Sequence, residues 1–338
     1  MLSKEDTRKT LEGVIASQPY KDANDIMALL KATTKYLDTL SSEIKFREEY
    51  KATYLDYPVV EQFFDLVISE YVAGDIISAL RTMKMALVDG SGHLALKRDT
   101  LFEGTALFRM RSQQRYKLLK RDEMFHIPTD KVQKVQNYRY SLNGFPCLYL
   151  GASLYVCWEE TRRPDIDKVN YVKMVPTKDI PVVSTLCPET FNDVNDVIQF
   201  YVFALCTKMA DNDKEKFQFQ YAFPELLLHL LINCMQSGDE AWGIKYVSAR
   251  YFENDGKFSS EPLFYNYVIP RRGQIDPKDH LSVELKSTFK VSDVHAYYEN
   301  RVYENHLPTM LTRPNEYANT HFMLLEKDLR AIKTLNFK

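Results

Sequence analysis

The apolar pattern of the chain changes at Gly90–Gly92, and this change limits the fold class more than any other feature of the sequence. Before it, apolar residues recur three or four positions apart, at helical spacing, in the stretches 26–40, 59–71 and 76–87. After it, short apolar runs bounded by Gly, Pro and Asn alternate with longer helical patterns. A helical region followed by mixed strands and helices predicts an α+β protein.

The elements expected beyond this break are short strands and a few helices. Strands are expected over residues 106–111, 146–150, 169–175, 181–186, 242–248 and 262–270. Helices are expected over residues 156–162, 194–210 and 323–333. A further helix is expected to start at Pro224 and run to residue 235, because proline is favoured at the first position of a helix.

Charge and composition exclude several classes of protein. Lys and Arg number 44 and Asp and Glu number 46, so a broad basic surface that binds nucleic acid directly is not expected. No stretch approaches the roughly 20 apolar residues of a membrane span, so no membrane association is expected. The first residues lack the apolar stretch of a secretory signal, and the five cysteines show no CxxC spacing. We therefore expect a cytoplasmic protein with reduced thiols.

The sequence contains none of the common catalytic motifs. It has no P-loop, no GxGxxG, no HExxH and no GxSxG pattern. The seven histidines are scattered without the spacing of metal ligands, so no metal site is expected. Any chemistry must therefore come from residues that are distant in sequence and that the fold brings together.

Residues 138–160 carry the most specific signal in the sequence. Arg139 stands before a polar turn, Tyr149 follows ten residues later on an apolar strand, and Glu160 follows eleven residues beyond that. This pattern resembles the RES domain, a family of NAD-degrading toxins named for its Arg, Glu and Ser. Glu159 is the adjacent alternative, and the family spacing favours Glu160.

The resemblance continues on both sides of this segment, over roughly residues 105–272. Residues 107–111 look like the first strand of the family, with Arg109 on its early Arg. Residues 242–250 are similar to its Gly-Ile-x-Tyr-x-Ser strand. Ser248 falls on the family Ser, where the resemblance implies a hydrogen bond to the ribose or to a phosphate of NAD.

The resemblance also implies a fold and a domain organisation. It implies a core like that of ADP-ribosylating toxins, in which small split β-sheets with flanking helices surround an NAD cleft. On this basis we expect an all-helical N-terminal region over residues 1–100 and a RES-like NAD-binding catalytic domain over residues 101–275. A C-terminal extension that ends in a helix is expected over residues 276–338.

Roles for the candidate residues follow from the chemistry of NAD. The planar guanidinium of Arg139 can bind two phosphate oxygens at once, and Arg109 is a second candidate for this contact. Tyr149 can stack on the nicotinamide, with Tyr140 as the alternate. Glu160 can stabilise the positive charge that develops on the ribose. NAD is the substrate in this scheme, and no cofactor is expected.

Three functions remain open from the sequence. The first, which we favour, is an NAD glycohydrolase or phosphorylase that cleaves the nicotinamide–ribose bond and depletes NAD as a toxin. The second is an ADP-ribosyltransferase that acts on a macromolecule. The third is a non-catalytic module that binds NAD or another nucleotide. Independently of these three functions, each candidate has an ordinary structural alternative: Arg139 as a surface salt-bridge partner, Tyr149 as a core tyrosine and Glu160 as part of a solvated helix face.

An NAD-depleting enzyme needs restraint in the cell that makes it. The resemblance implies a helix-turn-helix antitoxin as the protein partner. The helical residues 1–100 offer an alternative, since they are long enough to cover the cleft of the same chain. A homo-oligomer is also left open by the sequence.

Overall fold

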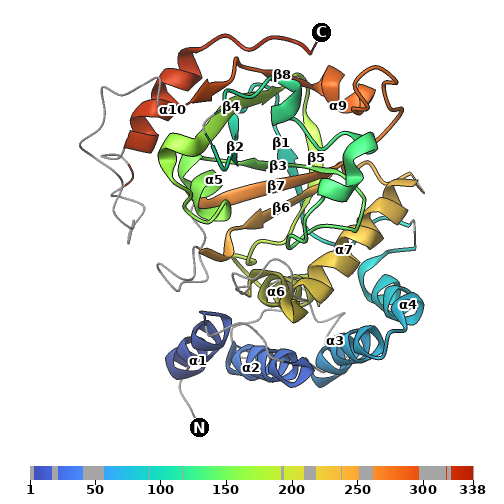
Figure 1. The fold of residues 1–338 in the computed structure, drawn as a ribbon. Coiled ribbons are helices and arrows are strands. Elements are labelled where there is room, and N and C mark those ends of the chain that lie inside the picture. The colour runs from blue at the N-terminus through green and yellow to red at the C-terminus, as the bar shows by residue number, and fades with distance from the viewer. Residues whose placement is uncertain are drawn as a thin grey trace.

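Helices flank one curled mixed sheet in the computed structural model, which confirms the α+β class (Figure 1). The structure describes residues 4–16, 22–40, 57–90, 92–115, 117–191, 194–208, 218–236, 238–250, 262–296, 317 and 321–337. An N-terminal helical layer lies at one end of the molecule, a pair of helices lies next to it, and the sheet follows (Figure 1).

Among the described residues, the N-terminal layer consists of the helices α1 (Lys4–Ala16), α2 (Ala23–Leu40), α3 (Tyr57–Val72) and α4 (Ile76–Leu87). The three periodic stretches of the sequence are therefore helical, as expected. The carboxylate of Asp75 caps α4 by accepting a hydrogen bond from the Ser78 N–H. This layer packs on α6 (Val194–Thr207) and α7 (Phe219–Gln236), which lie between it and the sheet (Figure 1).

The expected start of α7 at Pro224 was wrong, because the helix begins five residues earlier and Pro224 lies inside it. The chain enters the helix through a tight bond from the Tyr221 N–H to the Gln218 carbonyl, at 2.9 Å. Ala222 and Phe223 are buried on the first turns. Their burial offsets the backbone hydrogen bond that proline cannot donate.

In the segments that the structure describes, nine strands form one sheet. They are β1 (Arg98–Leu101), β2 (Leu107–Ser112), β3 (Cys147–Gly151), β4 (Val169–Pro176), β5 (Ile180–Ser184), β6 (Ile244–Val247), β7 (Tyr265–Pro270), β8 (Phe289–Val291) and β9 (His295–Ala296). The order is β1-β5-β6-β7-β3-β2-β4-β8, and β9 also pairs with β4. Only β5 and β6 pair in parallel; the other pairs are antiparallel.

The sheet is almost divided between β2 and β3. These two strands share the single register pair Phe108–Gly151, whereas β2 pairs with β4 along its whole length and β3 pairs with β7 along its whole length. The described strands thus form one sheet with a narrow junction between β2 and β3, where the family resemblance predicted small split sheets. The likeness to ADP-ribosylating toxins stays a prediction. A polar cavity can form between β2 and β3, because β2 hydrogen-bonds mainly to β4 and β3 hydrogen-bonds mainly to β7.

Short helices lie between the strands: α5 (Leu154–Glu160), α9 (Val283–Thr288) and the 3₁₀ turns η2 (Asp122–Met124), η3 (Thr129–Lys134), η4 (Ile166–Lys168) and η5 (Pro262–Phe264). The helix α10 (His321–Ala331) follows the last described strand. α10 confirms the helix expected near the C-terminus. Residues 297–316 and 318–320 of the expected C-terminal extension lie outside the described residues, as do the last two positions of the helix expected over 194–210.

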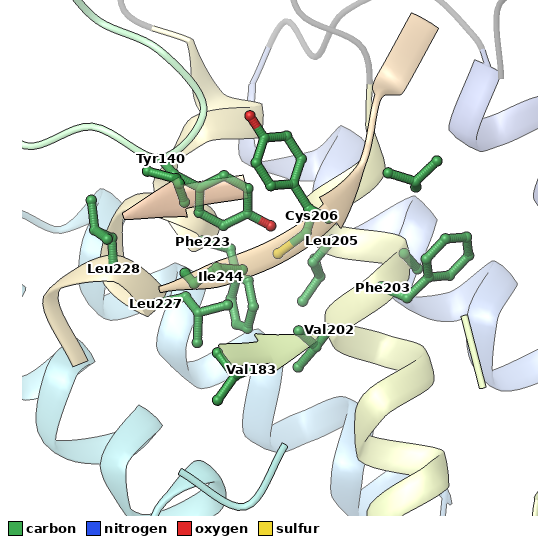
Figure 2. Close-up of a cluster of buried hydrophobic side chains, with 14 of the residues drawn as sticks. Tyr140, Val183, Val202, Phe203, Leu205, Cys206, Phe223, Leu227, Leu228 and Ile244 are labelled. Carbon is green, nitrogen blue, oxygen red and sulfur yellow. The ribbon is translucent and has the colours of Figure 1, made fainter. Parts of the chain in front are cut away.

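Both faces of the sheet are covered by apolar side chains. Figure 2 shows one face, where side chains of α6 and α7 meet Val183 of β5 and Ile244 of β6. On β7, Val268 points to that face, whereas Tyr267 and Ile269 belong to a second cluster on the opposite face. The first cluster extends without interruption into α1–α4. The boundaries proposed at residues 100 and 275 stay predictions.

No helix in the described segments combines the length and apolar character needed to cross a membrane. All five cysteines are free, and Cys147, Cys157, Cys206 and Cys234 are buried. Burial raises the pKa of Cys147 and Cys157 to about 12, so both stay protonated at neutral pH. The cysteines therefore behave as apolar core residues, as the sequence indicated.

Candidate active site

A cavity of about 400 Å³ opens where the two halves of the sheet diverge. Its walls come from β2, β3, the end of α5, the loop around residues 134–139 and the start of α7. Tyr246 of β6, residues 249–250 and Asn266 of β7 complete the lining. The lining combines tyrosine rings and aliphatic side chains with charged groups. A cavity of this size, apolar in part and with a few convergent polar groups, is typical of a small-molecule site.

The cavity is strongly cationic. Its lining includes Arg109, Arg111, Arg139, Arg162, Arg250 and Lys134, whereas Glu160 is the only carboxylate among the described lining residues. Such an excess of positive charge in a partly apolar pocket favours an anionic ligand. Guanidinium groups are especially suited to phosphate, because their forked N–H donors match two oxygens at once.

Arg109 and Arg111 stand two residues apart on β2 and therefore share a face of the strand. Arg109 donates to the Tyr149 carbonyl at 2.8 Å and Arg111 to the Phe125 carbonyl at 2.9 Å. The Nε atoms of both are buried and have no hydrogen-bond partner within the described segments. Burial, together with the like charge of Arg111, lowers the pKa of Arg109 to about 9. A bound anion would offset the repulsion between the like charges of Arg109 and Arg111.

Arg139 reaches the cavity from the loop that follows η3. It donates to the Cys206 carbonyl at the end of α6, at 2.5 Å, and its guanidinium carbon lies 5.8 Å from the centre of the Tyr221 ring. In the described part of the chain, the hydrogen-bond partners of Arg109, Arg111 and Arg139 are carbonyls rather than carboxylates. No carboxylate of the described segments therefore pairs with these three charges.

The end of α5 places its two adjacent carboxylates in opposite environments. Glu159 is 1% exposed and accepts two hydrogen bonds from Arg163, at 2.8 and 2.9 Å. Glu160 is exposed, lines the cavity and accepts a hydrogen bond from the Asn266 side chain at 2.9 Å. Arg162 and Arg163 follow with φ angles of 68° and 49°, a conformation that costs non-glycine residues energy. Only Glu160 is placed to touch a ligand.

Tyr149 presents its ring to the cavity, and its hydroxyl donates to the Tyr140 carbonyl at 2.7 Å. The Tyr138 ring meets it edge-on, with centroids 5.5 Å apart. Burial raises the pKa of Tyr149 well above its usual range, so the phenol stays neutral. Tyr149 can thus offer a flat, uncharged surface but no mobile proton.

Tyr140 and Ser248 lie behind the cavity wall rather than in it. Tyr140 is fully buried, and its hydroxyl lies 3.1 Å from the Thr185 hydroxyl. Ser248 is also fully buried, and its hydroxyl accepts a hydrogen bond from the Arg250 N–H at 3.2 Å. The structure therefore brings together four of the six candidates, Arg109, Arg139, Tyr149 and Glu160, and gives the other two supporting positions.

Several lining residues were not identified from the sequence: Arg111, Arg162, Arg250, Tyr221 and Asn266. Three of them had a signal, because Arg111 alternates with Arg109 on one strand, Arg250 follows Ser248 by two residues, and Asn266 lies in the strand expected over residues 262–270. Arg162 and Tyr221 had none, since only the fold brings the turn after α5 and the start of α7 to the same cavity.

Two further observations limit what the site can contain. Within the described residues, no group of His, Cys, Asp and Glu side chains could hold a metal ion. The described lining residues all fall between 109 and 266, so the described parts of α1–α4 do not line the cavity. The idea that the N-terminal helices cover the cleft in the same chain thus finds no support in these segments.

The fold and the site together define an α+β protein with a cationic cleft and one exposed carboxylate. Among curated proteins, the chain is similar to one from Bacillus subtilis (strain 168) described as "Putative toxin YopC". The two are 32% identical over 205 residues, which is 55% of this chain and 45% of that relative, so the similarity spans less than half of the relative's length. No family model matches the chain, and no solved structure matches it.

Proposed function

We propose that the chain is a toxin-like, NAD-consuming enzyme of the RES type that cleaves the nicotinamide–ribose bond. One observation carries this proposal: arginines that have no carboxylate partner among the described residues share a cavity with a single exposed carboxylate, Glu160. NAD has two phosphates that the arginines could bind, and a positive charge develops on its ribose during cleavage that Glu160 could stabilise. The similarity to a protein described as a toxin supports the toxin-like part of the proposal.

Binding would use the cations and the aromatic rings. The pyrophosphate of NAD would take the buried Nε–H groups of Arg109 and Arg111, which have no hydrogen-bond partner within the described segments, and Arg139 would bind from the loop after η3. The neutral ring of Tyr149 would contact the nicotinamide. These contacts exist in the ground state, so they would govern the affinity for NAD more than the rate of cleavage.

Cleavage would depend on Glu160. As the glycosidic C–N bond breaks, its electron pair leaves with nicotinamide, and the ribose carbon becomes electron-deficient. The carboxylate of Glu160, oriented by Asn266, would stabilise this charge. Water or phosphate then attacks the same carbon and loses a proton, which yields ADP-ribose or its 1-phosphate.

The proposal includes a compartment for the enzyme and a partner that restrains it. NAD is the substrate rather than a cofactor, and the enzyme would act in the cytoplasm. A helix-turn-helix antitoxin would be its restraining partner, since the described parts of α1–α4 do not line the cavity. Neither nucleic acid nor a membrane is proposed as a direct ligand, and a homo-oligomer stays open.

The test is to incubate the purified chain with NAD, with and without phosphate, and to follow nicotinamide by chromatography. Glu160→Gln should lower kcat by about 100-fold, because it removes a charge needed only in the transition state. Arg139→Ala should mainly raise KM. Glu103→Gln and Arg81→Ala, at exposed positions outside the cavity, are the matched controls and should behave like the wild type.

Each alternative outcome has a distinct meaning. Nicotinamide release that requires phosphate would identify a phosphorylase, and release without phosphate a glycohydrolase. Labelled ADP-ribose on a protein would identify a transferase. Calorimetric binding of NAD without any product would overturn the enzymatic proposal in favour of a binding module.

A further inference from the structure

The helix that carries Glu160 is too short to hold its own position. α5 has seven residues, and Glu160 is its last. Isolated helices of this length are not stable in water, because the first turn is costly to form and few hydrogen bonds follow it. The location of the Glu160 carboxylate therefore depends on whatever fixes α5 from outside.

The C-terminal helix α10 bonds directly to the start of α5. The Glu326 side chain of α10 is 5% exposed and accepts a hydrogen bond from the Leu154 N–H, the first of the helix. The Tyr317 hydroxyl donates to the same carboxylate. Ser153 accepts from the Val156 N–H at 2.9 Å. The first N–H groups of a helix have no partner within the helix. Of those at the start of α5, the Val156 N–H bonds to Ser153 and the Leu154 N–H bonds to Glu326 of α10.

Aromatic contacts extend this attachment along α5. The ring of Phe322 lies 5.9 Å from that of Tyr155 and 5.5 Å from that of Trp158. The ring of Tyr317 lies 6.2 Å from that of Tyr155. Contacts on successive turns fix the rotation of α5 as well as its start, and this rotation decides whether residue 159 or residue 160 faces the cavity.

The other end of α10 is bonded to the sheet. Lys173 of β4 is 5% exposed, and its ammonium group donates to the carbonyls of Arg330 and Ile332, at 3.0 and 2.5 Å. β2 pairs with β4 along the whole length of β2, and β2 carries Arg109. α10 therefore connects the strand that presents a cation to the helix that presents the carboxylate, as its position beside α5 and β4 indicates (Figure 1).

We infer that α10 is a positioning element of the candidate active site and that Glu326 is its positioning residue. Glu326 does not line the cavity; it fixes α5, and α5 fixes Glu160 relative to Arg109. As far as it concerns catalysis, this inference rests on the proposed function. The resemblance to RES toxins covers residues 105–272 and assigns no role to this helix.

The first arm of the test is kinetic. Glu326→Leu removes the acceptor, Glu326→Gln keeps one acceptor oxygen, and Asp328→Asn changes an exposed acid of the same helix as the control. Glu326→Leu should lower kcat for NAD cleavage about tenfold while KM stays within about twofold, because a misplaced Glu160 is felt mainly in the transition state. Glu326→Gln should recover most of the loss.

The second arm needs no NAD. Amide hydrogen exchange in residues 154–160 should be faster in Glu326→Leu and in Tyr317→Phe than in the wild type, and exchange in α6 and α7 should not change. Exchange of α5 at the wild-type rate in Glu326→Leu would overturn the inference. Faster exchange throughout the chain in both variants would overturn it too, because Glu326 would then support the whole fold.

The two arms separate this inference from the proposed function. A wild-type chain that releases no nicotinamide, with α5 still loosened selectively by Glu326→Leu, would overturn the proposed reaction but leave α10 as the element that positions Glu160. An active wild type with unchanged kcat in Glu326→Leu would keep the reaction and overturn the role of α10.

Discussion

His126 shows, at the scale of one residue, how a buried ring makes the stability of this fold depend on pH. It is fully buried, its Nε2 accepts from the Ser282 N–H at 2.9 Å, and its Nδ1 faces the Ile127 carbonyl at 2.8 Å. The neutral ring with a proton on Nδ1 satisfies both contacts. A second proton would face the Ser282 N–H, and burial lowers the pKa of His126 to about 4.

Stability should therefore fall as the pH drops from 6.5 to 4. In this interval the unfolded chain binds a proton at residue 126 and the folded chain does not, so acid favours unfolding by up to about 3 kcal/mol. Urea unfolding at pH 7 and at pH 4.5 measures how much the free energy of unfolding falls between these two pH values. This fall should be about 2–3 kcal/mol smaller in His126→Gln than in the wild type. It should be the same as in the wild type in His93→Gln, a partly exposed control. Equal pH dependence in both variants would contradict the assignment.

At the scale of the element, regular patterns could be predicted and ends could not. The helical repeat from Ile76 predicts α4 to the residue, and the apolar runs predict β2, β3 and β4 within one or two positions. α5 begins two residues before its expected start, since Ser153 caps it. β1 and α9 were missed, because four to six residues carry too little periodicity.

The candidate site was predictable to a similar extent. Tyr149 and Glu160 could be identified from their spacing, because they lie on a strand and on the helix that directly follows it in sequence. The role of Glu159 was not, because its burial depends on a turn in which Arg163 adopts a φ of 49°. Arg162 reaches the cavity through the same turn, so no local sequence pattern predicts that it lines the site.

The turn after α5 should be sensitive to the loss of one partner of its ion pair. Arg163→Met would leave the Glu159 carboxylate buried without its bidentate partner, which should destabilise the fold by about 3 kcal/mol. The double variant Glu159→Met/Arg163→Met should recover most of this, because no charge is then buried. Urea unfolding midpoints measure both effects.

The matched control for this ion pair lies a few residues further on. Lys168 and Asp165 form a salt bridge of 3.0 Å in which the side chains are 45% and 53% exposed. Lys168→Met should cost less than about 1 kcal/mol, because solvent screens an exposed pair. An Arg163→Met variant as stable as Lys168→Met would contradict the stabilising role assigned to the Arg163–Glu159 ion pair.

At the scale of the whole molecule, the N-terminal helices belong to the same core as the sheet. The Lys208 ammonium group, fully buried at the end of α6, donates to the Val14 carbonyl of α1 at 2.6 Å. The Thr34 hydroxyl of α2 lies 2.6 Å from the Tyr201 hydroxyl of α6. Because α6 and α7 present apolar side chains both to these helices and to the sheet, loss of either layer exposes the other.

The described layers should therefore unfold together. Both tryptophans, Trp158 and Trp242, lie in the sheet region, so their fluorescence reports on it, whereas circular dichroism at 222 nm reports largely on the helices. The two urea transitions should coincide. Thr34→Val, which removes a buried hydrogen bond to Tyr201, should shift both by about 1–2 kcal/mol. A shift of the dichroism curve alone would mean that residues 1–100 unfold as a separate domain, and the core shared by the N-terminal helices and the sheet would be disproved.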